Sequence, residues 1–84
     1  MDSMSEKQLA LWLTNQLHEN PEFQNYDVAS CTFKLDDDGN THFASYNIRC
    51  SGMETDNKAV CAIIDSLIKS AKKRFILEIN REHS

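Results

Sequence analysis

Three cysteines and a histidine are the residues of this chain that could do chemistry together: Cys31, His42, Cys50 and Cys61. Thiolate and imidazole groups bind zinc, and structural zinc sites usually draw their ligands from closely spaced pairs. The sequence contains no Cys-x-x-Cys pair. We therefore expect no metal site and no cofactor.

A thiol could also act as a nucleophile if a base lay within hydrogen-bonding distance. Cys31 or Cys50 near His42 would be the only candidates, and in the hairpin expected below Cys31 and His42 share a face but lie two pairs of that face apart. The cysteines point into an apolar face there, and burial of this kind raises the pKa of a thiol. We expect no catalytic residue, and we expect that the protein is not an enzyme.

The basic side chains near the C-terminus are typical of a surface that binds nucleic acid. The chain has a net charge of −4, yet residues 1–57 hold three basic and ten acidic side chains, whereas residues 58–84 hold six basic and three acidic ones. A basic helix face can bind nucleic acid, although lysines at the end of a helix also complement its dipole. The residues that would contact nucleic acid are Lys69, Lys72, Lys73 and Arg74.

The first element predicted around these residues is a helix over residues 5–19. Ser5 and Gln8 form a capping box, in which each side chain can bond the backbone N–H of the other. Asn20-Pro21 ends the helix, because the residue before a proline avoids the helical conformation. Its buried side repeats every fourth residue, as Leu9, Leu13 and Leu17, whereas Leu11 points away.

Two strands, over about residues 28–36 and 41–50, are predicted to form an antiparallel hairpin around Asp36-Asp-Asp-Gly-Asn40. A loop of two or four residues would place apolar side chains of both strands on one face. A loop of three residues would set the apolar face of one strand against the polar face of the other, so we expect the even loop. The apolar face then carries Ala29, Cys31, Phe33 and Leu35 with His42, Ala44, Tyr46, Ile48 and Cys50. The polar face includes Lys34, Phe43 and Arg49, and an aromatic ring between cations could also stack on a base.

A second helix is predicted over about residues 56–80, because apolar residues recur along one third of its circumference. The competing interpretation makes residues 74–79 a third strand, since Phe-Ile-Leu-Glu-Ile has strand character. No turn signal separates Ser70 from Phe75, which favours the continuous helix. Ile76 and Leu77 lie away from the main apolar stripe of this helix.

These elements predict an α+β fold of order α-β-β-α, with residues 1–84 in one domain and both helices on one face of the hairpin. Two strands about 4.8 Å apart make a narrow platform for two helices about 10 Å across. An isolated hairpin is also marginally stable and leaves two edges unpaired. A homodimer with a four-stranded sheet would widen the platform and pair one edge of each hairpin, so a homodimer is the expected assembly. The alternatives are a monomer completed by a third strand and an obligate complex with another protein.

The function that fits these features is a small protein-interaction or regulatory module, of the kind found among bacterial and phage accessory proteins; nucleic-acid binding is the alternative. No apolar run reaches the roughly 20 residues that span a bilayer, and no signal peptide precedes the first helix. We therefore expect a cytoplasmic protein that does not bind membranes. The expected partner-binding residues are Leu11, Lys34, Phe43, Arg49, Ile76 and Leu77.

Overall fold

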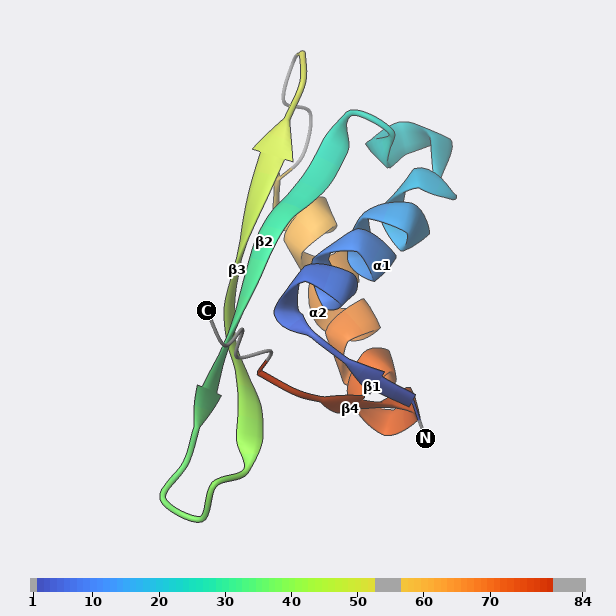
Figure 1. The fold of residues 1–84 in the computed structure, drawn as a ribbon. Helices are drawn as coiled ribbons and strands as arrows, with labels where there is room; N and C mark the ends of the chain where they lie inside the picture. Colours follow the sequence, from blue (N-terminus) through green and yellow to red (C-terminus); the bar gives the residue numbers. More distant parts are fainter. Residues whose placement is uncertain (1, 53–56, 80–84) are drawn as a thin grey trace.

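Two helices pack on a long β-hairpin, and a short parallel strand pair joins the two ends of the chain (Figure 1). This computed structural model describes residues 2–52 and 57–79. Its elements are, in order, β1 (Asp2–Met4), α1 (Glu6–His18), the 3-10 turn η1 (Pro21–Phe23), β2 (Tyr26–Leu35), β3 (Thr41–Cys50), α2 (Asn57–Arg74) and β4 (Phe75–Leu77). The α+β class is confirmed, but the order is β-α-β-β-α-β.

Helix α1 follows its sequence signals closely. The Ser5 hydroxyl accepts a bond from the Gln8 backbone N–H at 3.1 Å, and the Gln8 side chain accepts one from the Ser5 N–H at 2.9 Å. This is the expected capping box, and it satisfies two backbone donors at the start of the helix. The expected leucines of its buried side, Leu9, Leu13 and Leu17, are at most 1% exposed.

The prediction that the hairpin loop has an even number of residues is wrong. The Asp36 N–H donates to the Asn40 carbonyl at 2.9 Å, which leaves three residues, 37–39, in the loop. Gly39 has φ of +84°, as a glycine does in a three-residue hairpin loop. The Asp36 carboxylate also accepts from the backbone N–H groups of Asp38 and Asn40, at 3.0 and 2.8 Å. The side-chain bond with His42 and these two backbone bonds favour the charged form, so the pKa of Asp36 is lower than usual.

Two β-bulges allow apolar side chains of both strands to share one face despite the three-residue loop. The pairing shifts by one residue between Val28 and Ser30 and again between Thr32 and Phe33. Ala29 is the extra residue of β2, and Ala44 is the extra residue of β3. Each bulge reverses which side the following residues face, because side chains alternate along a strand.

The bulges change which side chains face the helices. Contrary to the expected register, Phe43 stands opposite Phe33 and packs against the core. Four residues expected on the apolar face are instead exposed: Ala29, Leu35, His42 and Ala44. The core side of the hairpin carries Tyr26, Val28, Cys31 and Phe33 from β2, with Phe43, Tyr46, Ile48 and Cys50 from β3.

Helix α2 ends at Arg74, not near residue 80 as the main interpretation predicted. Residues 75–77 form β4, so the competing strand interpretation is correct for this segment. Its partner was not expected, however, because β4 pairs in parallel with β1, Met4 standing opposite Leu77. The Glu78 N–H continues the pairing with a 3.0 Å bond to the Met4 carbonyl. Residues 80–84, which include the expected helix end, lie outside the described residues.

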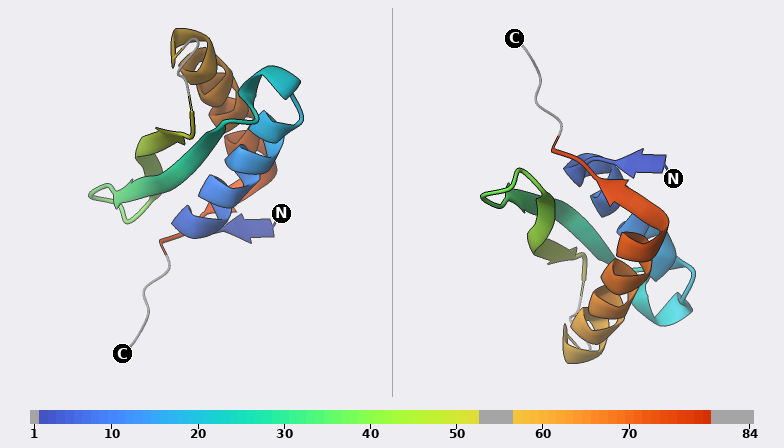
Figure 2. Two further views of the ribbon diagram at one scale, coloured as in Figure 1. Left: turned by 90° about the horizontal axis from the view of Figure 1, so that it is seen from above. Right: turned by 90° about the horizontal axis from the view of Figure 1, so that it is seen from below.

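Both helices lie on the same side of the hairpin, as expected, and enclose the core between them (Figure 2). Trp12 of α1 meets Phe75 of β4 edge to face, with ring centroids 5.7 Å apart, so the strand pair is fixed to the helix layer. From α2 the core receives Val60, Ile64, Ile68 and Ala71. Among the described helices none is long and apolar enough to cross a bilayer.

Candidate interaction site

One row of α1 side chains runs along the outer edge of β2. Glu6, Ala10, Thr14 and His18 are spaced four residues apart, so they lie on the same side of the helix, one turn after another. The three polar members all bond to β2, and Ala10 is only 7% exposed. α1 therefore bonds the outer edge of β2, the edge that faces away from β3, at Tyr26, Val28 and Phe33, and a hollow of about 580 Å³ lies between the helix and residues 29–31.

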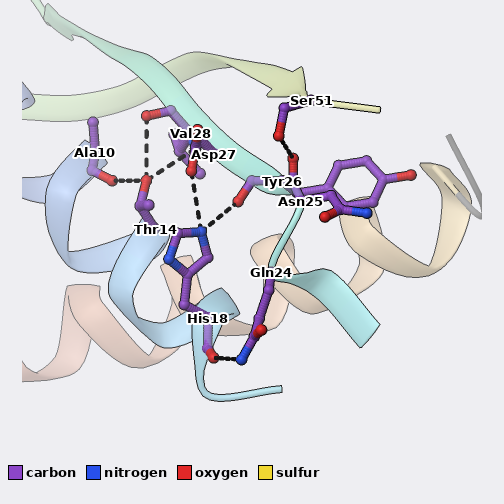
Figure 3. Close-up of polar contacts among 9 residues, drawn as sticks. All are labelled: Ala10, Thr14, His18, Gln24, Asn25, Tyr26, Asp27, Val28 and Ser51. Atoms are coloured by element: carbon purple, nitrogen blue, oxygen red, sulfur yellow. Dashed lines mark hydrogen bonds and ion pairs between the residues drawn. The ribbon is translucent and has the colours of Figure 1, made fainter. Parts of the chain in front are cut away.

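Thr14 and His18 cover the first half of this edge (Figure 3). The Val28 N–H donates to the Thr14 hydroxyl at 2.9 Å, and that hydroxyl lies 2.9 Å from the Ala10 carbonyl and 3.4 Å from the Val28 carbonyl. His18 Nε2 lies 2.9 Å from the Tyr26 carbonyl, which can only accept, so this nitrogen carries a proton. It also lies 3.0 Å from Asp27 Oδ1.

Glu6 covers the second half of the same edge. Its Oε2 accepts from the Phe33 N–H at 2.6 Å. Burial, together with the Glu6 charge, raises the pKa of the nearby Cys31 thiol to about 11. The thiol of Cys31 is therefore protonated at neutral pH, which fits a packing role.

The outer edge of β3 is different. The Val28 N–H points toward α1, so Ile48, which stands opposite Val28, directs its own N–H and C=O away from β2. Backbone groups alternate in direction along a strand, so Tyr46 directs its groups outward as well. Within residues 2–52 and 57–79, no other element bonds the outward groups of Tyr46 and Ile48.

The side chains along this open edge are only half-buried. Phe43, Tyr46, Ile48 and Cys50 all pack against the core but keep intermediate exposure. Tyr46 also contacts α2, where burial raises its pKa and a hydrogen bond with the Cys61 side chain adds to this effect. At Tyr46 and Ile48 the β3 edge thus combines outward backbone groups that no other described element bonds with an incompletely covered apolar row.

The structure brings three of the expected partner-binding residues together and separates the others. Phe43, Ile76 and Leu77 line a hollow of about 340 Å³ where the start of β3 meets β4. Phe43 and Leu77 are half-buried there, whereas Ile76 is 49% exposed. The exposure expected for Phe43 and Leu77 is therefore only partial, because both pack against the core.

The other three expected partner-binding residues lie elsewhere on the surface. Leu11, 62% exposed, lines a second hollow of about 700 Å³ beside Ile79. Lys34 and Arg49 are exposed at opposite ends of the hairpin. The six residues therefore do not form one surface.

The basic residues occupy the last turns of α2 and are all exposed. Lys72 lines the smaller hollow together with His42 and Phe75, and the Arg74 guanidinium lies 5.8 Å from the centroid of the Phe75 ring. The residues of this basic turn are Lys69, Lys72, Lys73 and Arg74.

The thiols and the histidine considered for chemistry are separated. His42 is exposed and lies 2.7 Å from Asp36 Oδ2, on the opposite face from the buried Cys31. This corrects the expectation that the two share a face, because the Ala44 bulge lies between them. Among residues 2–52 and 57–79 there is no group of three His, Cys, Asp or Glu side chains that could hold a metal ion.

Sequence reasoning missed the α1 row that covers β2. Its signal is a polar series, Glu6, Thr14 and His18, directly beside the buried leucines instead of opposite them. No known protein family, curated protein or solved structure compared with this chain matches it.

Proposed function

We propose that this protein is a small, non-enzymatic interaction module that binds a protein partner by adding a strand to the outer edge of β3. In this mode, backbone hydrogen bonds provide affinity and alternate side chains provide specificity. Its role would then be regulatory or adaptor-like, with the partner determining the process.

The observation that carries this proposal is the contrast between the two hairpin edges. At the β2 edge, Glu6, Thr14 and His18 occupy outward backbone groups. At the β3 edge, no element within residues 2–52 and 57–79 bonds the outward backbone groups of Tyr46 and Ile48. Proteins commonly protect sheet edges against pairing with other chains. The contrast between the two edges therefore supports the β3 edge as the binding surface.

Hydrogen exchange on the captured complex tests the binding surface. Immobilised protein would recover partners from an extract of the source organism, and exchange would then be compared with and without the partner. We expect new protection at Tyr46 and Ile48. Ile76→Asp, at an exposed position of β4, serves as a control that should not change recovery. Protection confined to α2 or β4, with β3 unchanged, would contradict the proposal.

Nucleic-acid binding is the second candidate, supported by the exposed basic turn of α2. Lys72 lies beside the hollow that contains Phe75, where a cation and an aromatic ring are adjacent. A salt-sensitive gel shift of RNA or DNA that is lost in the Lys69→Glu, Lys72→Glu, Lys73→Glu triple variant would support this function. No shift at low salt would exclude it.

A further inference from the structure

We infer that the strand added to β3 is β3 of a second copy, paired antiparallel about a twofold axis at Asn47. This inference rests on the proposed strand-addition function and names its partner. The two hairpins would form one four-stranded sheet, with the helices of both copies on the same face.

The sequence of β3 fits pairing with another strand. Its ten residues contain no proline and no lysine, two residue types that commonly protect an edge. Its own extra residue is Ala44, toward the hairpin loop, so residues 45–50 contain no extra residue; the bulge opposite Asn47 and Ile48 lies on β2, at Ala29. A monomer with this open edge would expose a template for association.

The alternation of β3 selects the twofold arrangement. Side chains directly opposite each other must lie on the same face of a continuous sheet, and here Tyr46 and Ile48 face the helices whereas Asn47 faces outward. An axis at Asn47 places Tyr46 of each copy opposite Ile48 of the other, so there are two such pairs. Both pairs join an aromatic to a β-branched side chain, which is a favourable cross-strand combination.

Charge also fits a second copy. The chain has a net charge of −4, but no aspartate or glutamate lies between Thr41 and Cys50. Arg49 is the only lysine or arginine in this strand, and the axis at Asn47 places it opposite Ser45 of the second copy rather than opposite itself. Two acidic molecules would therefore meet along an element without carboxylates, and like charges would not stand directly opposite each other.

Cysteine cross-linking tests the register. In the proposed pairing, the two Asn47 residues form a non-hydrogen-bonded pair with Cα atoms about 4.5 Å apart, within disulfide range. Under mild oxidation we expect Asn47→Cys to become mostly covalent dimer. The matched control is Ser45→Cys, which is exposed on the same face but about 13 Å from its symmetry mate, at about 3.3 Å per residue. It should cross-link no more than the wild-type chain.

Charge substitution tests the same axis without oxidation. Asn47→Lys would place two ammonium groups opposite each other and should raise the dimer dissociation constant about five- to tenfold. Ser30→Lys is the matched control: it breaks the same Asn47–Ser30 hydrogen bond, 3.2 Å long, and adds the same charge one strand further from the axis. It should leave the dissociation constant nearly unchanged.

The outcomes separate this inference from the proposed function. A wild-type chain that remains a 9.6 kDa species at high micromolar concentration would overturn the second copy as partner. Equal cross-linking of the two cysteine variants, or a dimer insensitive to Asn47→Lys, would overturn the proposed axis. In either case strand addition by another protein would still be decided by the exchange experiment on the captured complex.

Discussion

At the scale of single residues, Thr14 is the side chain that connects α1 most directly to the hairpin. Its hydroxyl accepts from the Val28 N–H and lies close to two carbonyl groups. Val28 is only 5% exposed, so water would not easily replace this bond. A single hydroxyl thus both covers part of the β2 edge and holds the helix against it.

We predict that Thr14→Val lowers the free energy of unfolding by about 1–3 kcal/mol, the usual cost of leaving a buried backbone donor without a partner. Urea denaturation followed by circular dichroism would measure it. Thr14→Ser, which retains the hydroxyl, is the control and should lose less. Equal stabilities of Thr14→Val and wild type would show that the hydroxyl does not matter.

Asp36 stabilises the hairpin loop through bonds that require its carboxylate to be charged. Its pKa in the folded state is lower than the 3.8 of a free side chain, so its contribution is present above that value and is lost as the pH falls through the folded-state pKa. We predict that Asp36→Asn lowers the melting temperature at neutral pH and reduces its fall on acidification. A variant with the same acid dependence as wild type would contradict this role.

At the scale of elements, the sequence predicts those structures whose signals are local. The helix start at Ser5 and the leucine repeat are both contained within α1, and both were predicted correctly. The positions of the hairpin strands were also predicted to within about two residues. Their pairing was not, because no local signal in the sequence marks the bulges at Ala29 and Ala44.

The end of α2 at Arg74 was not predicted either, because it too has no local signal. No glycine or proline interrupts the sequence after Asn57, so helix periodicity alone predicts continuation past Arg74. The strand forms because β1, at the other end of the chain, provides its partner. The row of α1 residues that covers β2 was missed because polar residues beside an apolar stripe usually indicate only the boundary of the buried face.

This account predicts the effect of removing β1. In a chain that lacks residues 1–4, residues 75–77 lose their partner, and the local sequence favours extension of α2. We expect their Cα chemical shifts to change from strand-like to helix-like values, with the hairpin shifts retained. Ser3→Ala, which changes only an exposed side chain, should leave them unchanged. Strand-like shifts in the truncated chain would show that β4 does not depend on β1.

At the scale of the whole molecule, α1 and α2 cover the hairpin unequally. α1 bonds the outer edge of β2 at three residues, whereas no other element among the described residues bonds the outer groups of Tyr46 and Ile48, which lie in a half-buried apolar row of β3. The narrow platform expected from two strands is therefore only partly compensated within the chain. A four-stranded sheet would complete it, and this is the central claim of the proposed assembly.

Amide exchange measured residue by residue over a series of protein concentrations tests this claim most directly. The proposed assembly predicts that protection of the Tyr46 and Ile48 amides rises with concentration, while the Val28 and Phe33 amides, already bonded by α1, change little. Exchange at Tyr46 and Ile48 that is fast and independent of concentration would show that β3 does not pair with a second copy.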